Sequence, residues 1–529
     1  MKFFLSILFT AVASATYSQR NIDVLHYRYE IELSDQSDSI KGHASITIRF
    51  LEAVDSFALD LKNSGVSSKK GMTAYVVFGK EYNAHSFQKD DKLFIVPGHT
   101  IKKGEERIFE IRYSGIPSDG LIISKNKFGN RTFFADNWPN RAHNWIPCND
   151  DPADKASVEF IVTAPSHYQV VSNGIMIEES NLPGNKKLTH YKEDVELPTK
   201  VMVIGAADFA VNLVGNLDCI PVYSWVFPEN RNEGFTDYAM AKDILAYHIN
   251  YIGPYPYKKL ANIQSKTIFG GMENAGAIFY AEGSVTGNRY DEELLSHEIV
   301  HQWFGDMATE KSFAHLWLSE GFATYLTHLY IGSKYGVDSL NHEMQFDRNR
   351  VLEFVKTSHR PVVDSTTNLM SLLNANSYQK GSWVLHMLHR ELGDSVFHES
   401  IRRYYSTYAG KNAETSDLQK IFELVSGKDL SQFFKQWLFT PENPSLQLTW
   451  KYDATKKTVD LHVKQLQKNI FHFPLDLLFA TLTGTVPSQQ ILIDQKEMDF
   501  SFPMSEKPIR LIADPNISLL FEASITEKK

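Results

Sequence analysis

HEIVH at residues 297–301, followed by Glu320 within WLSEGFATYL, is the stretch of sequence that decides the fold. On a helix, residues four apart lie on one face, so His297 and His301 can direct their imidazoles to a single metal ion. The Glu320 carboxylate supplies a third ligand and leaves a fourth position open on zinc. Glu298 can reach a water molecule at that position. The sequence therefore predicts a zinc hydrolase with one Zn²⁺ per chain.

A chance match is the alternative, because surface helices are often rich in His and Glu and a bare HExxH is only moderate support for a metal. Here the pentapeptide continues into QWFGD at residues 302–306, and Glu320 lies in a separate amphipathic stretch that begins near Leu316. This context favours a metal site. Asp306 has two interpretations that stay open: an acceptor for a ligand imidazole, or an exposed carboxylate at a helix end.

Length and charge narrow the class of protein. The chain has 529 residues, more than a single typical core holds, so about two to four domains are expected. The formal net charge is −9, and acidic and basic residues are mixed along the chain. No basic cluster is interleaved with aromatic residues, so nucleic acid is not an expected partner. The oligomeric state does not follow from the sequence.

The first residues, 1–18, have the pattern of a secretory signal peptide, MKFFLSILFTAVASATYS. Their apolar run of about 13 residues is shorter than the roughly 20 that span a bilayer. Cleavage after Ala15 or Ser18 predicts an exported protein, periplasmic or extracellular, without integral membrane association; an uncleaved N-terminal anchor is the minor alternative. Cys148 and Cys219 are the only cysteines. We interpret both as structural and leave a bridge between them open.

Hydrophobic periodicity divides the remaining chain into three parts. Residues 19–207 alternate with period two, as at Tyr27 and Tyr29, and predict an N-terminal antiparallel β domain. Helical periodicity dominates residues 208–444, which predict a mostly helical domain that carries the metal. Alternation returns in residues 445–529 and predicts a small C-terminal β-sandwich. The predicted fold class is multidomain α+β.

A second motif, GGMEN at residues 270–274, precedes the apolar run AGAIFY. A glycine pair before an apolar run suits an edge strand, and paired glycines let the backbone of a ligand approach closely. Alone the motif is weak, because a Gly-Gly turn before a strand is common and Glu273 fits a solvated edge charge equally well. The motif becomes informative only in combination with the HEIVH motif and Glu320 that follow it.

GGMEN followed by HEIVH and Glu320 resembles the gluzincin aminopeptidases, the family of aminopeptidase N and leukotriene epoxide hydrolase. The resemblance extends from about Ile22 to the C-terminal β region and implies a thermolysin-like catalytic domain. It implies that Glu273 binds the free α-ammonium of a peptide whose backbone pairs with the glycine strand. The substrate-binding residues implied are Gly270, Gly271, Met272, Glu273 and Asn274. The chain resembles a short form, without the large C-terminal helical domain.

Two further residues take expected roles from this resemblance. Tyr378, in NSYQKG, matches the tyrosine that donates a hydrogen bond to the oxyanion. Counting back from PCND at residues 147–150 puts Trp138 where many members carry a Gln or Glu that shares amine recognition, and an indole cannot accept that hydrogen bond. Asp136 or Asn137 could substitute, or Trp138 could stack on the first side chain of the substrate.

We therefore predict a zinc metalloaminopeptidase that hydrolyses the N-terminal bond of peptides with a free α-amine. Glu298 would act as general base and return the proton to the leaving amine, and Tyr378 would stabilise the oxyanion. Three alternatives stay open: a thermolysin-like endopeptidase, an epoxide hydrolase, and a non-catalytic peptide-binding protein on the same fold. The preferred first residue and the limit on peptide length do not follow from the sequence.

Overall fold

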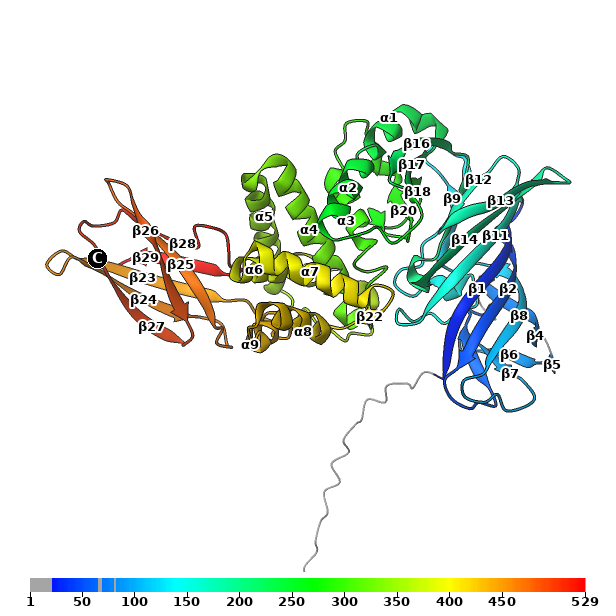
Figure 1. Cartoon of the computed structure of the whole chain (residues 1–529), viewed down its shortest axis with the longest axis horizontal. Helices are drawn as coiled ribbons and strands as arrows, with labels where there is room; N and C mark the ends of the chain where they lie inside the picture. Colours follow the sequence, from blue (N-terminus) through cyan, green and yellow to red (C-terminus); the bar gives the residue numbers. More distant parts are fainter. Residues whose placement is uncertain (1–20, 65–68, 80–81, 529) are drawn as a thin grey trace, which may run out of the picture.

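A computed structural model describes residues 21–64, 69–79 and 82–528 of the chain. The predicted signal peptide, residues 1–18, lies outside the described residues. The described chain forms three parts that follow one another in space in chain order: a β-rich N-terminal part, a central part rich in helices, and a β-rich C-terminal part (Figure 1). The central part therefore contacts both of the others.

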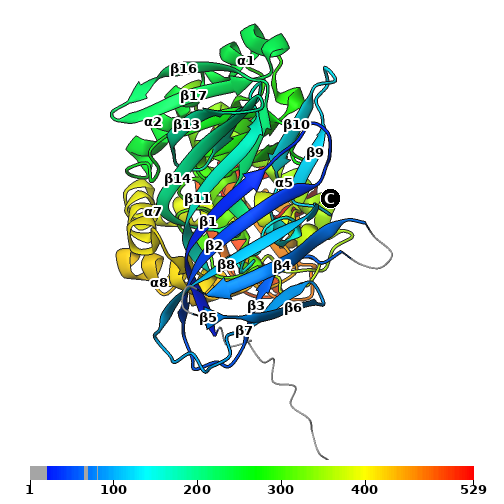
Figure 2. The ribbon, with the colours of Figure 1, turned by 90° about the vertical axis from the view of Figure 1, so that its right-hand side faces the viewer.

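The N-terminal part is built on an eight-stranded sheet whose long strands run across one face of the molecule (Figure 2). The strand order is β13-β14-β11-β1-β2-β8-β4-β5. Tyr27, Tyr29 and Ile31 of β1 are buried between less buried neighbours, as the period-two pattern predicts. The strands are β1 (Ile22–Glu32), β2 (Ile40–Phe50), β4 (Gly71–Gly79), β5 (Tyr82–Asn83), β8 (Glu106–Ile116), β11 (Lys155–Pro165), β13 (Ile175–Leu182) and β14 (Lys186–Pro198).

One pair in this sheet departs from the antiparallel arrangement predicted. β1 runs parallel to β11, with Tyr29 opposite Phe160, whereas β1 and β2 are antiparallel. The two rings stack at 5.4 Å, and the Tyr29 hydroxyl donates to the carbonyl of Pro147 at 2.9 Å. The N-terminal part is thus mixed. Alternation along a strand shows which face is buried, but it contains no information on the direction of the neighbouring strand.

Two smaller sheets complete the N-terminal part. The first has the order β12-β15-β10-β9 and the second the order β3-β7-β6. Their strands are β3 (Phe57–Asp60), β6 (His85–Lys89), β7 (Lys92–Val96), β9 (Leu121–Lys125), β10 (Arg131–Ala135), β12 (Gln169–Ser172) and β15 (Ile204–Ala207). Because β10 ends at Ala135, it delivers the next three residues, ending in Trp138, to the boundary with the central part.

The central part begins with a five-stranded sheet of order β16-β17-β18-β20-β19. The GGMEN motif forms the short strand β19, which lies at the edge of this sheet as predicted. Helices follow. The elements are β16 (Ala210–Leu217), β17 (Ile220–Val226), β18 (Leu260–Ser265), β19 (Gly271–Met272), β20 (Ala277–Ala281), α1 (Arg231–Tyr238), α2 (Ala241–Tyr251), α3 (Glu292–His301), α4 (Trp317–Tyr335), α5 (Val337–Val355), α6 (Gly381–Leu392), α7 (Asp394–Tyr408), α8 (Thr415–Ser426) and α9 (Ser431–Leu438).

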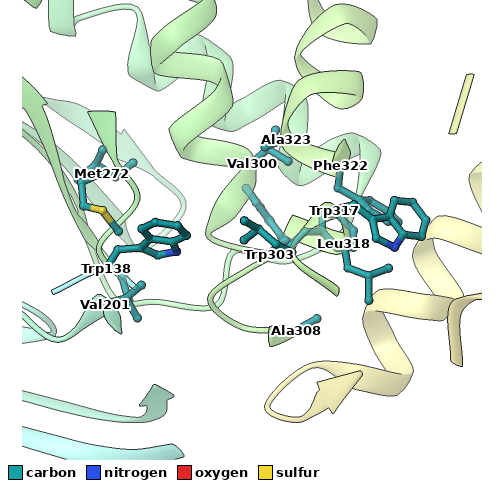
Figure 3. Close-up of a cluster of buried hydrophobic side chains, with 14 of the residues drawn as sticks. Trp138, Val201, Met272, Val300, Trp303, Ala308, Trp317, Leu318, Phe322 and Ala323 are labelled. Atoms are coloured by element: carbon teal, nitrogen blue, oxygen red, sulfur yellow. The ribbon is translucent and has the colours of Figure 1, made fainter. Parts of the chain in front are cut away.

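The HEIVH helix α3 packs against α4 through a buried apolar cluster (Figure 3). Val300, Trp303, Trp317 and Phe322 belong to this cluster and are fully buried. The Phe322 ring also stacks on the ring of Phe304 at 4.4 Å. Close packing of this kind holds the relative position of two helices to within fractions of an ångström, which any group shared between them requires.

The C-terminal part contains two sheets, of order β27-β24-β23-β29 and β26-β25-β28. The Phe479 and Phe502 rings of the two sheets meet at 5.3 Å. The strands are β23 (Ser445–Asp453), β24 (Thr458–Gln465), β25 (Phe473–Ala480), β26 (Thr485–Ile493), β27 (Glu497–Pro503), β28 (Arg510–Ala513) and β29 (Glu522–Glu527). Arg348 of α5 joins this part to the centre, because its guanidinium donates to the Asp514 carboxylate at 2.5 Å and to the Leu519 carbonyl at 2.6 Å.

Both cysteines are free thiols, so the structure has no bridge between them. Cys148 is buried in the N-terminal part, while Cys219 is exposed between β16 and β17, which does not support a structural role for it. Within the described ranges, no helix is both long and apolar enough to cross a membrane.

Candidate metal centre

Helices α3 and α4 bring three ligand groups together. The Glu320 carboxylate oxygen lies 3.2 Å from Nε2 of His297 and 3.2 Å from Nε2 of His301. The two imidazole nitrogens are 3.1 Å apart. His301 and Glu320 are buried, and His297 is partly buried. The i, i+4 spacing on α3 thus produces the convergence that the sequence predicts, and α4 contributes its carboxylate from the neighbouring helix.

The spacing of these three atoms fits zinc. Bonds of about 2.0–2.1 Å at tetrahedral angles separate ligand atoms by about 3.3 Å, and the observed separations are 3.1–3.2 Å. Two nitrogens and one oxygen also form a donor set that zinc accepts with one position left open. Three atoms that need no movement to receive an ion make a preformed site.

Ser319 orients one of the ligands, and sequence reasoning missed it. Its hydroxyl lies 2.9 Å from Nδ1 of His301, and the carbonyl of Phe304 lies 3.1 Å from the same nitrogen. A hydrogen on Nδ1 leaves the Nε2 lone pair free for a metal, and such outer contacts hold the ring in place. The sequence offered one signal, the position of Ser319 directly before Glu320, whereas its contact with His301 is visible only in the structure.

Glu298 is buried beside the cluster, with 5% of its surface exposed. Burial raises the pKa of its carboxyl group well above the ordinary value, and the carboxylates of Glu273 and Glu320 act in the same direction, while His301 opposes them. A raised pKa brings a carboxylate closer to the range in which it can both accept and return a proton near neutral pH.

Gly271 provides the space for this carboxylate. A Cβ atom at Gly271 would lie 2.3 Å from Oε1 and 2.5 Å from Cδ of Glu298. The sequence suggested that the glycine pair admits the backbone of a ligand, and the structure adds that the second glycine also admits Glu298. The first glycine is different, since a Cβ atom at Gly270 would meet only Cδ1 of Leu294 at 3.8 Å.

If Glu298 is the base that the sequence predicts, Gly271→Ala is expected to lower kcat by about 10²-fold, because a displacement of about 1 Å in a reacting group has effects of that size. Gly283→Ala is the control and is expected to change kcat little, since Gly283 lies outside the cavity, a Cβ atom there would meet nothing within 4 Å, and neither Gly271 nor Gly283 has a positive φ that alanine would strain. Steady-state kinetics on an aminoacyl chromogenic amide, with circular dichroism to verify folding, measures both. Equal losses in the two variants would contradict the specific contact with Glu298.

Gln302, the residue after HEIVH, fixes the GGMEN segment. Its Nε2 donates to the carbonyl of Glu273 at 2.6 Å, and its Oε1 accepts from the N–H of Gly276 at 2.7 Å. The Tyr255 hydroxyl also donates to Oε1 at 3.1 Å. One amide on the metal helix thereby sets the position of the edge strand, a role that only the tertiary contact reveals.

The Glu273 side chain lies in the same cavity as the ligand cluster and is 6% exposed. Within the part of the chain that the structure describes, no group donates a hydrogen bond to its carboxylate. The buried ammonium of Lys200, whose pKa Glu273 affects, pairs instead with Glu310 at 2.5 Å. Burial lowers the pKa of the Lys200 ammonium, but Glu310 and Glu273 outweigh this effect and raise it. Glu273 is therefore a buried acceptor that is free to bind a cation.

Asp306 matches neither interpretation drawn from the sequence. It is fully buried rather than exposed, and its carboxylate accepts from Nε2 of Gln302 at 3.1 Å rather than from an imidazole. The Nδ1 position of His301 is already taken by Ser319 and Phe304. Asp306 therefore acts indirectly: it binds the Gln302 amide, which in turn holds the GGMEN segment.

Tyr378 lies in a π-helical turn, 376–380, at the start of α6. Its ring stacks on the ring of His297 at 5.9 Å with an interplanar angle of 15°. Burial raises the pKa of the hydroxyl well above its ordinary value, and the Glu320 carboxylate beside it adds to the effect, so the group remains a proton donor. Lys380, two residues on, is buried and donates to the Glu442 carbonyl at 3.0 Å, which is a structural contact.

A close contact between two helices couples Tyr378 to the ligand Glu320. Gly321 of α4 faces Gly381 of α6, and a Cβ atom on either glycine would lie 2.9 Å from the Cα of the other. The helices thus meet backbone to backbone, immediately after Glu320 and three residues after Tyr378. Only glycine permits this approach.

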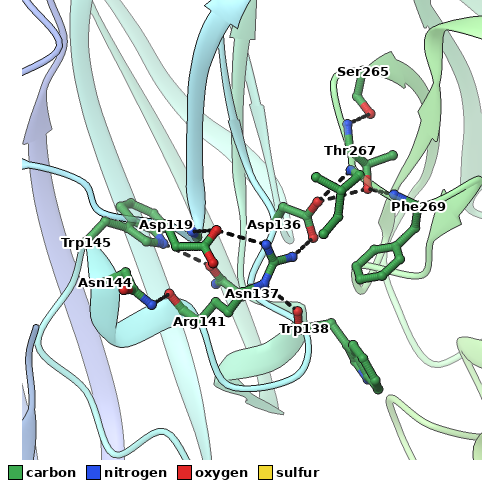
Figure 4. A network of polar contacts seen from close by, with 12 residues as sticks. Asp119, Asp136, Asn137, Trp138, Arg141, Asn144, Trp145, Ser265, Thr267 and Phe269 are labelled. Carbon is green, nitrogen blue, oxygen red and sulfur yellow. Dashed lines mark hydrogen bonds and ion pairs between the residues drawn. The ribbon is translucent and has the colours of Figure 1, made fainter. Parts of the chain in front are cut away.

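Trp138 lines the cavity from the N-terminal part and is 2% exposed. Its ring contacts Phe269 edge-on at 5.8 Å, and its carbonyl accepts from Nε of Arg141 at 2.7 Å (Figure 4). Asp136 and Asn137, the proposed substitutes in amine recognition, have other partners. Asp136 accepts from Arg141 at 2.6 Å, and Asn137 donates to the carbonyl of Met202 at 2.6 Å. Both therefore serve to hold the loop, and Trp138 alone presents its side chain to the cavity.

The cavity has a volume of about 410 Å³, and the three residues of the ligand cluster are part of its lining. Trp138, Met272 and Glu273 line it on the side of the N-terminal part. Phe346 and Arg350 of α5 line it on the other side. A ligand that enters can therefore contact the N-terminal part and the central part at once.

Comparisons with known proteins agree with this arrangement. The peptidase family M1 domain matches residues 235–437, and the peptidase M1 N-terminal domain matches residues 24–201. The probable aminopeptidase 2 of Sulfurisphaera tokodaii is 29% identical over 371 residues, which cover 66% of this chain and 46% of the relative. Aminopeptidase M1 of Arabidopsis thaliana is 30% identical over 322 residues, covering 56% of this chain and 36% of the relative.

Two solved structures share the fold. Legionella pneumophila aminopeptidase A, in complex with aspartic acid, has a TM-score of 0.82 at 18% identity and covers 96% of this chain and 60% of its own. The M1 zinc metallopeptidase of Deinococcus radiodurans has a TM-score of 0.70 at 21% identity and covers 80% of this chain and 95% of its own. This chain spans less than half the length of the two relatives described above.

Proposed function

Because the chain belongs to peptidase family M1, we propose that it is a zinc aminopeptidase that removes the first residue from peptides with a free α-amine. One observation carries the proposal. The buried, unpaired carboxylate of Glu273 lies in the same cavity as Glu298 and the ligand cluster. A metal cluster alone is compatible with any metallopeptidase, whereas a neighbouring anion with no partner selects a substrate that brings a cation to that position.

His297, His301 and Glu320 would hold the zinc ion. When bound, zinc at this site would polarise the scissile carbonyl and acidify a water molecule. Glu298 accepts a proton from the attacking water and later returns it to the nitrogen of the leaving residue. The space at Gly271 permits the Glu298 carboxylate to approach, and its burial keeps bulk water from competing for the proton.

Tyr378 donates a hydrogen bond to the oxygen that gains negative charge as the carbonyl is attacked. Its position beside His297 and Glu320 supports this role, and its raised pKa keeps the hydroxyl protonated. Donors of this kind contribute about 10²- to 10³-fold to kcat when they are positioned before the reaction begins.

Glu273 selects the first peptide bond. A free α-ammonium pairs with its carboxylate and places the first carbonyl at the ligand cluster. A blocked or internal peptide leaves Glu273 buried without a partner, and an uncompensated buried charge costs several kcal/mol. The strand β19 beside it is at a sheet edge and can pair with the peptide backbone.

We expect the wild-type protein to hydrolyse an aminoacyl chromogenic amide at least about 10²-fold faster, in kcat/KM, than its N-acetyl derivative. Glu273→Ala should reduce this ratio to near unity, mainly through loss on the free amine. Measurement of kcat/KM for both substrates with both proteins tests the proposal. A wild-type preference for the acetylated substrate would instead favour an endopeptidase.

A further inference from the structure

We propose that Arg350 binds the C-terminal carboxylate of the substrate, so that the protein favours peptides of a few residues whose other end is free. This inference rests on the proposed aminopeptidase function and extends it to a substrate class. Within the described ranges, Arg350 is the only lysine or arginine that lines the cavity containing the ligand cluster. A guanidinium in a substrate cavity that has no carboxylate partner is available to an anionic group of a ligand.

The guanidinium has no carboxylate partner, although carboxylates are close in sequence. Among the described residues, none comes within ion-pair distance of Arg350, and its guanidinium lies 5.4 Å from the centre of the Phe346 ring instead. Asp347 is already paired with His328 at 2.9 Å. Stacking on Phe346 leaves the N–H groups at the edge of the guanidinium free to form two parallel hydrogen bonds with a carboxylate.

The position of Arg350 is opposite to that of Glu273. Glu273 follows β19 at the edge of the central sheet, next to α3, whereas Arg350 is on α5, which packs against the far side of α4 (Figure 1). The ligand cluster on α3 and α4 lies between them. A peptide whose ammonium contacts Glu273 and whose first carbonyl meets the cluster therefore continues toward α5. A free peptide is positive at its start and negative at its end, which is the order of the charges in the cavity.

Contacts with the C-terminal part hold helix α5 in place. Arg348, two residues before Arg350, donates to Asp514 and to the Leu519 carbonyl of the C-terminal part. Its guanidinium also lies 4.9 Å from the Trp383 ring. Because α5 is anchored on that side, Arg350 belongs to a fixed helix rather than to a loop. This reduces the conformational entropy that is lost when substrate binds.

Glu293 and Glu343 also line this side of the cavity and weaken its attraction for anions. Arg350 is exposed, so water screens its charge. Together these features limit the expected effect to about fivefold to tenfold in kcat/KM, the lower range for a hydrogen-bonded charge pair.

The test compares a tripeptide of alanine as the free acid with the same tripeptide as its C-terminal amide. In the wild-type protein we expect kcat/KM to be about fivefold to tenfold higher for the acid. Arg350→Gln should bring the ratio near unity, and Arg350→Lys, which keeps the charge without the paired donors, should give an intermediate ratio. Arg403→Gln, an exposed arginine on α7 outside the cavity, is the control and should keep the wild-type ratio.

A carboxylate can also come from a side chain, so a third substrate separates the two sources: the tripeptide amide with glutamate as its last residue. If Arg350→Gln affects this amide but not the free acid, the terminal carboxylate is not the ligand and the proposal fails. An acid-to-amide ratio that is unchanged in Arg350→Gln also overturns it. Failure of the aminopeptidase proposal would appear separately, as absence of a preference for the free amine over the acetylated one in the wild-type protein.

Discussion

Glu298→Gln is expected to lower kcat by about 10²- to 10⁴-fold while the zinc content stays at one ion per chain. The substitution keeps the size of the side chain and its place against Gly271, but an amide cannot accept the proton of the attacking water. The three ligand atoms belong to other residues, so metal binding should persist. Turnover of an aminoacyl chromogenic amide and metal analysis by mass spectrometry, on the same preparation, measure the two quantities.

Glu353→Gln is a suitable control, because Glu353 is an exposed residue of α5 whose one ion pair among the described residues is with Lys356 on the surface. It should change neither kcat nor zinc content. If Glu298→Gln retained wild-type kcat, another group would have to be the base. If it lost zinc together with activity, the carboxylate would be acting on the ligand cluster and not on the proton transfer.

Glu320→Gln should abolish both zinc binding and activity. The substitution leaves the two imidazole nitrogens 3.1 Å apart without the carboxylate oxygen that lies 3.2 Å from each, and a neutral amide is a poor ligand for zinc. We expect kcat/KM to fall by more than about 10³-fold, the consequence of losing several kcal/mol of transition-state stabilisation. Metal content after dialysis against a chelator, followed by addition of zinc, measures the affinity directly.

Wild-type protein treated in the same way should lose its activity and recover it when one equivalent of zinc is added. Circular dichroism should show that Glu320→Gln remains folded, since α3 and α4 are held mainly by their apolar cluster. A variant that binds zinc stoichiometrically and remains active would rule out Glu320 as a ligand. Recovery of the wild type with magnesium instead of zinc would contradict the choice of metal.

The elements of the site that sequence could predict are those governed by local geometry. The i, i+4 spacing puts His297 and His301 on one face of any helix, and the amphipathic stretch around Glu320 indicates a second helix. Edge placement of the GGMEN strand follows from its glycines and from the apolar run after it. The three-part architecture likewise follows from the change between periods of two and 3.6 residues.

The features that the sequence could not predict depend on which segments, distant in the chain, contact one another in the fold. The direction of β11 beside β1, the burial of Asp306 and the free state of both cysteines required the tertiary structure. From the sequence, Gln302 is only a polar residue at the end of a helix. The structure shows that it holds the GGMEN segment. Arg350 has no motif at all, because its position in the cavity results from the packing of α5 against α4 and the C-terminal part.

The contact between Gly321 and Gly381 has a consequence for how the protein fails under heat. Where two helices touch backbone to backbone, side chains have little room to adjust to a partial shift, so the contact is either intact or lost. Glu320 directly precedes Gly321 on α4, and Tyr378 lies in the turn that leads into α6. Warming should therefore not produce a population that still binds zinc but has reduced activity. Zinc binding and catalytic activity should be lost in the same cooperative transition.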